Sequence, residues 1–400
     1  MIRRLAEGRT VRSVGVEEEL LIVEPGTGRP RALASAVIRA AGPGAVEPGS
    51  VEPGSVEPGP GELCADERSA GERDAVQPLE FELQKQQLEI DTRPCYSLDE
   101  LGRELRRCRA TAAAAAARAG VTVAALGTSP VAVHPEVAPT SRYQAMAKAF
   151  GLTAQEQLTC GCHVHVGISS AEEGVAVLDR IQPWLATLLA LSANSPFWQG
   201  VDTAYASFRY QAWGRWPCSG PTYPFGSVEV YQATVQQMID TETLLDSGMV
   251  YFDARLSQRY PTIEVRIADV CQHAEDAVLI AALIRGLVET EARNWQAGRS
   301  DPPARTEQLR LARWRASRSG LDDVLINPVT FRPDKAVAVT GLLVEHVRDA
   351  LTDAGDTPVV GGLLDAVLRR GNGAAAQRSE YQRRGRLMDV ITAAATTTTS

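Results

Sequence analysis

The sequence predicts an α+β fold with a largely antiparallel sheet. Three segments alternate apolar and polar residues with the period of two that is typical of strands, at 13–23, 159–168 and 261–270. Helical segments stand between and after them, but without the regular strand–helix alternation of a doubly wound parallel sheet. Irregular interspersion of this kind favours one antiparallel sheet packed against helices.

The N-terminal part contains the first strand, an insertion and a second strand-like region. Residues 43–61 run PGAVEPGSVEPGSVEPGPG, a repeat of Val-Glu-Pro-Gly-Ser. Dense Pro and Gly cannot hold a helix or an interior strand, so we expect a flexible surface insertion. Strand character returns at 79–92, LEFELQKQQLEIDT.

Helices follow where capping residues and apolar runs mark them. A capping box at Ser97 opens a helix that runs through an alanine-rich stretch and stops at Gly120, and a short strand is expected at 121–126. The next helix starts near Ala171 and should bend or break near Pro183.

The second half of the chain is expected to be mostly helical. A long loop region rich in aromatics, Arg and Pro covers 195–227, and helix signals return at 234–247. After the third alternating strand, helices occupy most of the remainder, with 277–284 as a buried helix. The tail at 393–400 is expected to be frayed.

Composition narrows the classes of protein. The net charge of −8 argues against a general nucleic-acid binder, since such proteins need clustered Lys and Arg. No uninterrupted apolar stretch reaches the roughly 18 residues of a membrane span, and the basic N-terminus lacks the features of a secretory signal. Seven scattered cysteines fit reduced thiols, so a cytoplasmic protein without nucleic-acid or membrane partners is expected.

Charged side chains share one face of each alternating strand, because residues two apart point to the same side of a sheet. The charged pairs are Glu17 and Glu19, His163 and His165, and Glu264 and Arg266. A half-buried sheet with one solvated face is the ordinary explanation of such a pattern. A merely solvated face, however, favours Thr, Lys and mixed polar residues rather than Glu-x-Glu, His-x-His and Glu-x-Arg.

These charged faces predict a metal site. Two carboxylates on one face repel each other unless a cation lies between them. Carboxylates with a histidine suit Mg²⁺, or Mn²⁺ as the alternative, because both ions prefer oxygen ligands. We therefore expect a magnesium-dependent enzyme.

Other metal and nucleotide sites are disfavoured. A zinc site at 160–165 would need Cys160 and Cys162 on the same face as the histidines, and alternation sends both cysteines to the opposite face. The sequence has no G-x-x-x-x-G-K-[ST] loop, no G-x-G-x-x-G between a strand and a helix, and no G-x-S-x-G elbow. A nucleotide would therefore bind through metals and arginines on a sheet.

Six stretches together resemble the carboxylate–amine ligases of glutamate–cysteine ligase type 2, within the glutamine-synthetase-like superfamily. They are VGVEEELLIV at 14–23, EFELQKQQLEIDT at 80–92, QLTCGCHVHVGI at 157–168, NSPFWQG at 194–200, YASFRYQAWGRWP at 205–217 and MVYFDARLSQRYPTIEVRIADVC at 249–271. The resemblance covers most of the chain from 14 to about 390, and the Pro/Gly insertion falls between motifs.

This resemblance implies a fold and a reaction. The fold is a single catalytic domain over 1–400, in which a curved, mainly antiparallel sheet backed by helices forms one wall of a funnel-shaped site. In the reaction, ATP phosphorylates a carboxylate, usually the γ-carboxylate of glutamate, and an amine attacks the acyl phosphate. With cysteine as the amine, the products are γ-glutamylcysteine, ADP and phosphate. Assembly into homo-oligomers is compatible with the resemblance.

The motif match also implies roles for individual residues. It assigns metal ligation to Glu17, Glu19, His163 and Glu264, with Glu82 and Glu89 supplying a second metal position. His165 is assigned to a nucleotide phosphate, and Arg266 to the transferring phosphoryl group. Arg209, Arg215 and Arg259 are candidates for the substrate carboxylate or phosphates, because Arg binds both in a bidentate manner.

Several points stay open at this level. Glu82 and Glu89 lie at opposite strand parity, so both reach the site only if 85–87 bends the chain. A surface or ion-pair role is the alternative for each arginine. Nothing identifies the amine, and a different amine or carboxylate is the first alternative. A non-catalytic relative that binds a metal or nucleotide is the second.

Overall fold

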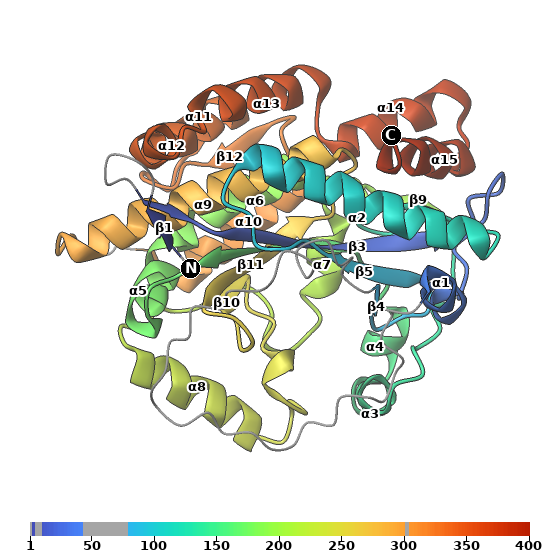
Figure 1. Ribbon diagram of the computed structural model, residues 1–400, viewed down its shortest axis with the longest axis horizontal. Coiled ribbons are helices and arrows are strands. Elements are labelled where there is room, and N and C mark those ends of the chain that lie inside the picture. The colour runs from blue at the N-terminus through green and yellow to red at the C-terminus, as the bar shows by residue number, and fades with distance from the viewer. Residues whose placement is uncertain (1, 5–9, 43–78, 301–303) are drawn as a thin grey trace.

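The computed structural model describes residues 2–4, 10–42, 79–300 and 304–400, so the insertion expected at 43–61 lies outside the described residues. The described part confirms the predicted fold class. Helices pack on a seven-stranded sheet in which every paired strand is antiparallel to its neighbour. Figure 1 shows this sheet edge-on across the middle of the molecule.

The central sheet has the order β10–β11–β7–β3–β5–β4, and β6 adds to β3 beyond this path. Its strands are β3 (Val14–Val23), β4 (Glu80–Phe81), β5 (Gln87–Asp91), β6 (Thr122–Ala124), β7 (Gly161–Gly167), β10 (Ala254–Leu256) and β11 (Thr262–Asp269). Three two-stranded sheets pair β1 (Ile2–Arg4) with β2 (Thr10–Arg12), β8 (Phe197–Trp198) with β9 (Val201–Asp202), and β12 (Val324–Ile326) with β13 (Pro333–Lys335). The three strands predicted from alternation are therefore the adjacent strands β3, β7 and β11.

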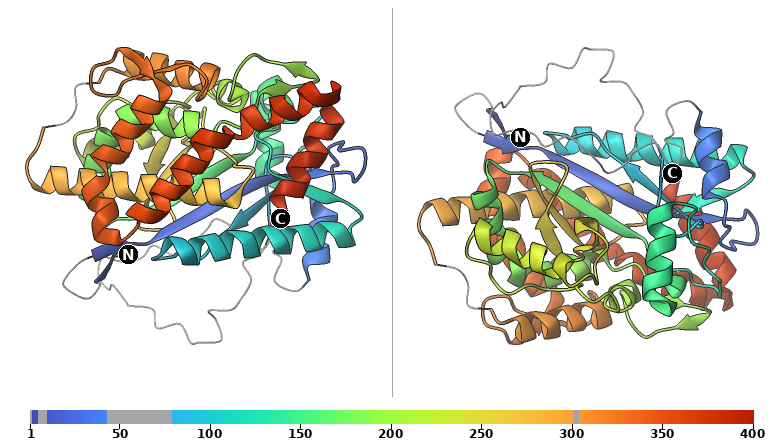
Figure 2. Two further views of the ribbon diagram at one scale, coloured as in Figure 1. Left: turned by 90° about the horizontal axis from the view of Figure 1, so that it is seen from above. Right: turned by 90° about the horizontal axis from the view of Figure 1, so that it is seen from below.

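A helical layer covers one face of the sheet. Helix α2 (Leu98–Arg118) packs on β3 and β5, α9 (Ala274–Gln296) on β3 and β7, and α6 (Leu185–Ser192) on β11. Seen from above, helices lie across the strands, whereas from below the strands are visible between α3 and α8 (Figure 2). Apolar side chains fill the covered face, and Cys160 and Cys162 lie among them as predicted.

The other helices surround this core. They are α1 (Ala34–Ala41), α3 (Ser141–Phe150), α4 (Leu152–Glu156), α5 (Ala171–Ile181), α7 (Phe208–Trp213), α8 (Val228–Asp240), α10 (Thr306–Ser319), α11 (Ala336–His346), α12 (Arg348–Ala354), α13 (Thr357–Arg370), α14 (Gly373–Arg384) and α15 (Leu387–Thr398). A 3₁₀ turn at Gln182–Trp184 separates α5 from α6, so the break predicted at Pro183 is confirmed. The stretch Ala171–Ser192 is long and apolar enough to span a membrane, but it is 94% buried and serves as a core element.

One buried ion pair crosses the covered face. Glu18 points toward the helices, unlike Glu17 and Glu19, and is fully buried. Arg109 of α2 donates to both of its carboxylate oxygens, at 2.8 and 2.6 Å, and to the carbonyl oxygens of Cys271 and Gln272. The pair ties α2 to β3 from behind the sheet.

Four segments differ from the expectation. The strand-like region 79–92 is interrupted between β4 and β5. The helix expected at 234–247 is α8, which begins earlier, at Val228, because the Ser227 hydroxyl accepts from the Val230 N–H. The predicted loop region 195–227 contains β8, β9 and α7.

The C-terminal tail is the fourth difference. The tail expected to fray at 393–400 instead continues α15 through Thr398, since its inner side is buried against the core.

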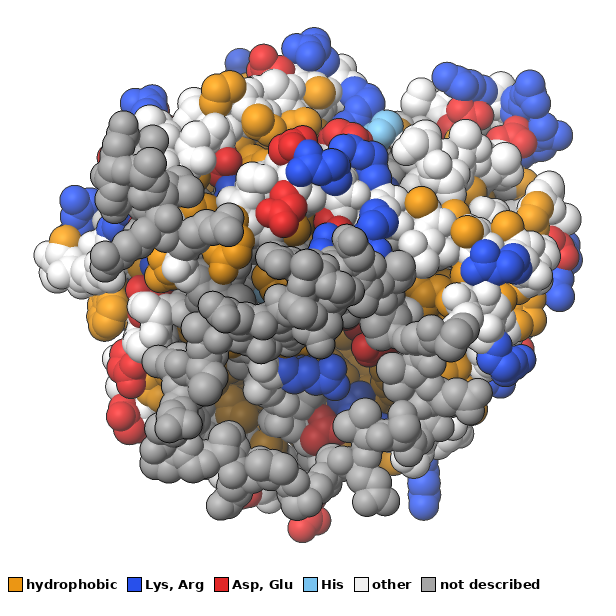
Figure 3. Space-filling model, viewed as in Figure 1, with side chains coloured by type: hydrophobic (Ala, Val, Ile, Leu, Met, Phe, Trp, Pro, Cys, Tyr) orange, Lys and Arg blue, Asp and Glu red, His pale blue; other side chains and the backbone are white. Residues whose placement is uncertain are grey.

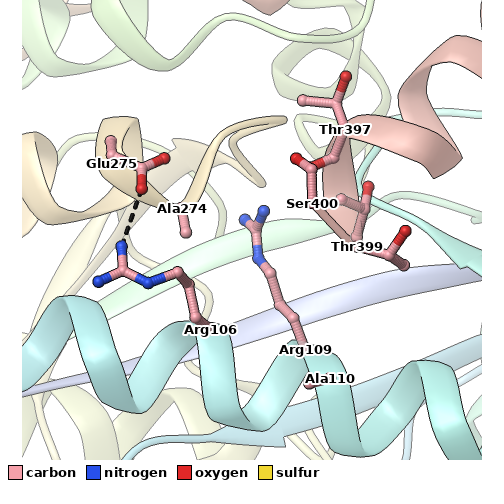
Figure 4. A pocket seen from close by; sticks show the side chains of 9 residues that line it. Arg106, Arg109, Ala110, Ala274, Glu275, Thr397, Thr399 and Ser400 are labelled. Atoms are coloured by element: carbon pink, nitrogen blue, oxygen red, sulfur yellow. Dashed lines mark hydrogen bonds and ion pairs between the residues drawn. The ribbon is translucent and has the colours of Figure 1, made fainter.

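A small cavity of about 30 Å³ lies between α2, the start of α9 and the C-terminal residues (Figure 4). Arg106 there pairs with Glu275 at 2.8 Å, and the Arg109 guanidinium is engaged by Glu18. A cavity of this volume has room only for a few water molecules, so it is too small for a substrate. The face in Figure 3 carries acidic and basic side chains interspersed among its coloured residues, with no continuous basic band among them.

Candidate active site

A cavity of about 620 Å³ lies on the open face of the sheet. Its acidic lining residues are Glu17, Glu19, Glu80, Glu82, Glu89, Asp91, Asp246 and Glu264. Its basic and histidine residues are Arg142, Arg255, Arg259, Arg266, His163 and His165. Aromatic side chains from outside the central strands complete it, including Tyr143, Trp213, Trp216 and Tyr251. One acidic wall therefore faces a partly aromatic one.

Strand register arranges the charged wall in rows. Glu264 is opposite His165, and His163 is opposite Glu17, which is in turn opposite Asp91. In the next row Glu19 is opposite Glu89. Because directly opposed residues of an antiparallel pair share a face, alternation within each strand brings all these side chains to the cavity.

A first group of candidate metal ligands consists of Glu17, His165 and Glu264. One ligand atom of each lies within 4.8 Å of the others. His165 Nε2 is 2.8 Å from Glu17 Oε1, although the two atoms form no aligned hydrogen bond. Ligands at adjacent octahedral positions around Mg²⁺ stand about 3 Å apart, given metal–oxygen distances of 2.0–2.1 Å. The pair is thus spaced as two ligands of one ion would be.

The two histidines lie in different places relative to the candidate metal ligands. His163 was expected to be a metal ligand, but the residue grouped with Glu17 and Glu264 is His165. His163 lies deeper, with Nδ1 3.2 Å from Glu17 Oε2 and 3.4 Å from Arg266 Nη1. Its Nε2 atom is buried, 3.7 Å from Glu19 Oε1, and has no hydrogen-bond partner. His163 therefore lies between the two groups of carboxylates.

The charges in the first group favour metal binding at neutral pH. Burial opposes ionisation of Glu264, but Arg266 and Arg255 outweigh it and lower its pKa to about 2. Burial and the nearby Arg266 lower the pKa of His163 to about 4, so this imidazole is neutral. Although burial acts in the other direction, the hydrogen bond with His163 and the close approach of the His165 imidazole hold the pKa of Glu17 well below its usual range. The carboxylates are thus ionised without bound metal.

A second group consists of Glu19, Glu82 and Glu89, again with ligand atoms within 4.8 Å. The turn between β4 and β5 contains Lys85 and Gln86, and it places Glu82 and Glu89 on the same side despite their opposite parity. The bend at 85–87, which Glu82 and Glu89 need if both are to reach the site, is therefore present.

The second group lacks the charge balance of the first. Burial and the Glu19 carboxylate raise the pKa of Glu82 to about 7, and burial with Asp91 raises the pKa of Glu89 well above its usual range. Three carboxylates that lie close together, one buried and two half-buried, fit a divalent cation, since only oxygen donors are present and the cation would supply the missing charge.

Two arginines flank Glu264. Arg266 pairs with its Oε1 atom, and Arg255 donates to both carboxylate oxygens at 2.7 and 3.3 Å. Sequence reasoning missed Arg255, although its stretch was noted. The pairing of β10 with β11 would have identified Arg255, because it sets this residue directly opposite Glu264.

The other predicted arginines occupy different environments. Arg259 lines the cavity from the loop between β10 and β11. Arg215 lies outside the cavity and pairs with Glu156 at 2.7 Å on the surface, so the prediction of a nucleotide-binding role is not supported by its position. Arg209 is 2% exposed and lies behind the cavity wall, so the prediction of direct substrate contact is likewise not supported.

Further residues reach the cavity from outside the three alternating strands, and sequence analysis assigned no role to Arg142, Asp246 or Asp91 among them. Arg142 of α3 donates to both oxygens of Asp246 at 2.7 and 3.0 Å, which joins two segments beside the cavity. Asp91 ends β5 beside Glu17, and burial together with Glu17 raises its pKa to about 7. Trp213 and Trp216 both reach the cavity, and Trp216 is also a core residue.

Sequence comparison finds matches over nearly the whole chain. Residues 13–393 match the family described as glutamate–cysteine ligase family 2. A provisionally named glutamate–cysteine ligase 2-1 of Streptomyces avermitilis is 50% identical over 386 residues, which are 96% of this chain and 98% of that protein. A provisionally named glutamate–cysteine ligase 2 of Streptomyces coelicolor is 47% identical over 384 residues, 96% of this chain and 98% of that protein.

Solved structures share the fold at low sequence identity. A glutamate–cysteine ligase from Francisella tularensis, determined in complex with AMP, superposes with a TM-score of 0.67 at 12% identity, covering 98% of this chain and 89% of that one. A bifunctional glutathione synthetase from Pasteurella multocida gives a TM-score of 0.64 at 15% identity, covering 97% of this chain. The chain spans about half of that longer protein, 52% of its length.

Proposed function

The chain belongs to glutamate–cysteine ligase family 2, and from this premise we propose that it is an ATP-dependent ligase that joins the γ-carboxylate of glutamate to the amine of cysteine. In the proposed reaction, the γ-carboxylate attacks the γ-phosphorus of ATP and ADP leaves. The cysteine amine then attacks the acyl phosphate, releases phosphate and loses a proton, which leaves γ-glutamylcysteine.

The observation that carries this proposal is the pair of acidic groups on one wall of a single cavity, with Arg266 beside them. Phosphoryl transfer between two anions depends mainly on positioning and on neutralising charge. Mg²⁺ held by Glu17, His165 and Glu264, and by Glu19, Glu82 and Glu89, would supply that neutralising charge.

The chain's own residues would orient the reactants. Arg266 is fixed by Glu264 and is 9% exposed, so it can direct its positive charge into the cavity with little reorganisation. Arg259 has no ion pair among the described residues and lies on a loop, so it suits a phosphate or carboxylate of a substrate. The aromatic side chains opposite the carboxylates would exclude water from the acyl phosphate.

The test is ADP release from Mg-ATP with glutamate and a panel of amines that includes cysteine. Release that needs both glutamate and cysteine, with γ-glutamylcysteine identified by mass spectrometry, supports the proposal. Dependence on glutamate and another amine supports the alternative ligase. Folded protein that binds Mg-ATP but releases no ADP with any amine would rule out both and leave the non-catalytic relative.

Hydroxylamine provides a second readout that does not depend on the natural amine. As a small strong nucleophile it intercepts an acyl phosphate and yields γ-glutamyl hydroxamate. Hydroxamate formation that requires both ATP and glutamate supports the acyl phosphate. If ADP is released with cysteine but hydroxylamine gives no hydroxamate, the intermediate is wrong.

A further inference from the structure

A buried polar layer adjoins the second group of carboxylates. Register shifts between Val265 and Ala268 of β11, so that Asp269 lies opposite Gly161 of β7. An extra residue in one strand changes which side the following residues face. Asp269 is therefore on the same side of the sheet as Glu264, although it is fully buried and does not line the cavity.

Asp269 is held in place by three hydrogen bonds. Its Oδ2 atom accepts from the Asn194 N–H at 2.8 Å and from the Ser195 hydroxyl at 2.7 Å. Its Oδ1 atom accepts from the Ser207 hydroxyl at 2.8 Å. The carboxylate is thus a fixed negative charge that joins the loop before α7 to the end of β11.

Arg209 of α7 lies over Gly161, next to this fixed charge. A Cβ atom at Gly161 would overlap Arg209 Nη2, so the absence of a side chain there makes room for the guanidinium. Arg209 Nη1 is 3.9 Å from Asp269 Oδ1, and Trp213 covers the guanidinium with its ring centroid 5.8 Å away.

The guanidinium of Arg209 is loosely bonded for a buried charge. Its Nη1 and Nη2 atoms reach the carbonyl oxygens of Ile267 and Arg266 only at 3.4 Å, and its Nε atom has no hydrogen-bond partner. Hydrogen bonds of this length are weak. Charge and packing therefore set its position more than hydrogen bonds do.

Glu19 lies on the other side of Gly161. Its Oε2 atom accepts from the Gly161 N–H at 2.7 Å, and its pKa is raised by burial, with Arg209 the largest opposing influence. No ion pair within 4.0 Å joins Arg209 to Glu19 in the described structure. The Arg209 guanidinium thus lies between two carboxylates, those of Asp269 and Glu19, and is closer to Asp269.

We propose that Asp269 is a positioning residue: it holds Arg209 over Gly161 and thereby keeps Glu19 free to bind a divalent cation with Glu82 and Glu89. Without the charge of Asp269, the attraction between Arg209 and Glu19 is unopposed. The guanidinium would then pair with Glu19 and compete with the cation. The inference rests on the proposed function only through the second metal group.

Mn²⁺ binding to the full chain without nucleotide, measured by calorimetry, tests this coupling. Asp269→Asn keeps the size of the side chain and removes its charge, and it should weaken Mn²⁺ binding about tenfold, in the range of couplings between neighbouring charged groups. In the double variant Asp269→Asn/Arg209→Met the competing cation is gone, so affinity should return to within about twofold of Arg209→Met alone.

Two results would overturn the proposal: wild-type Mn²⁺ affinity in Asp269→Asn, or a double variant that binds as weakly as Asp269→Asn. A wild-type chain that binds no Mn²⁺ would overturn it together with the metal site. If Asp269→Asn lacks a cooperative thermal transition, Ser195→Ala replaces it, because this change removes one hydrogen bond to Asp269. About a threefold loss of affinity then supports the proposal, and unchanged affinity overturns it.

ADP release, measured in parallel, separates this inference from the proposed function. An active wild type with unchanged Mn²⁺ binding in Asp269→Asn rejects only the positioning role. The expected coupling in a chain that releases no ADP with any amine rejects only the reaction.

Discussion

Glu264 combines two requirements in one carboxylate. It neutralises Arg255 and Arg266, and it also lies within ligand distance of Glu17 and His165. Its position between two arginines lowers its pKa to about 2, although burial opposes this, so it stays ionised over the whole physiological range. A cation bound here would meet a carboxylate whose charge and orientation are already set.

Glu264→Gln should therefore abolish turnover and also lower stability. A neutral amide cannot balance the cation, so kcat/KM should fall by about 10²-fold or more. The buried Arg266 and the half-buried Arg255 also lose their shared counter-charge, which should cost about 1–3 kcal/mol of unfolding free energy. ADP release and urea unfolding measure the two effects.

The matched control is Glu80→Gln, which changes a carboxylate of the same cavity that belongs to neither candidate metal group. It should retain activity within a few-fold of wild type. Wild-type turnover in Glu264→Gln would show that the first metal group is misplaced.

Two carboxylates of the cavity, Glu82 in the second group and Asp91 beside Glu17, predict a pH-dependent stability in the absence of metal. Glu82 and Asp91 have a pKa raised to about 7, from ordinary values of 4.5 and 3.8, mainly by burial. The folded protein then holds protons that the unfolded chain has released, so its stability falls as pH rises to about 7. Burial lowers the pKa of His163 from 6.5 to about 4. His163 therefore makes the stability rise with pH, but only below pH 6.5.

The window from pH 6.5 to pH 8 excludes the opposing effect of His163. Although burial acts in the other direction, the Glu17 carboxylate raises the pKa of His165, so proton loss from His165 adds to the fall in stability. With EDTA present, Tm should decrease across this window by about 3 °C or more. Mn²⁺ should reverse the decrease, and Glu82→Gln should make it smaller, because the amide does not titrate whereas Asp91 still does. A metal-free Tm that rises from pH 6.5 to pH 8 would contradict the charges assigned to this group.

Among the strands, the charged faces were predictable and the contacts between strands were not. Alternation is a local property, so Glu17, Glu19, His165 and Glu264 could be placed on one face from the sequence. The proximity of Arg255 to Glu264 depends on strand pairing, which local pattern does not specify.

Departures from regular strand geometry were harder still. The turn at Lys85 and Gln86 brings Glu82 to the site, and the register shift in β11 brings Asp269 under Arg209. In both places one or two residues change the side that later residues face, and alternation alone does not reveal where that happens. The different neighbours of His163 and His165 likewise follow from residues on other strands.

Strand β7 offers a direct test of the packing behind the site. Gly161→Ala would place a Cβ atom against Arg209 and His163, whose Nε2 atom would be 2.9 Å away. Replacing glycine in a strand interior ordinarily stabilises by about 0.5–1 kcal/mol. At Gly161 the overlap with Arg209 and His163 outweighs this gain. Gly161→Ala should therefore lower Tm and weaken Mn²⁺ binding.

Gly15→Ala is the matched control because Gly15 stands opposite His165 on β3. A Cβ atom there would meet only Thr92, at 3.8 Å or more, which is ordinary contact. Gly15→Ala should keep the wild-type Tm or raise it. If both variants behave alike, the close approach of Arg209 to Gly161 is wrong.

Across the whole molecule, the sheet separates two kinds of buried charge. On the helix side, Glu18 and Arg109 neutralise each other beside a cavity of only about 30 Å³. On the open side, carboxylates outnumber their arginine partners around a cavity of about 620 Å³. Buried charge is costly unless it is paired, so the unbalanced side is the one that fits cations and anionic substrates.

The C-terminal helix α15 completes the core at the far end of the sheet. Its sequence ends in AAATTTTS, whose threonines have low helix propensity, and this is why local reasoning predicted fraying. Tertiary contacts override that propensity: Ile391, Ala394 and Ala395 are buried, and the Thr398 hydroxyl accepts from the Ala125 N–H of the segment after β6 at 2.8 Å.

Thr398→Ala should therefore destabilise the whole fold, because it leaves the buried Ala125 N–H without an acceptor. Such a loss costs about 1–3 kcal/mol of unfolding free energy, measurable by urea unfolding with one cooperative transition. Thr396→Ala is the control, since both hydroxyls bond to a carbonyl four residues earlier, but Thr396 is exposed. Equal stability of the two variants would mean that α15 is not anchored through Thr398, whereas a loss confined to Thr398→Ala would establish the C-terminal helix as part of the cooperative core.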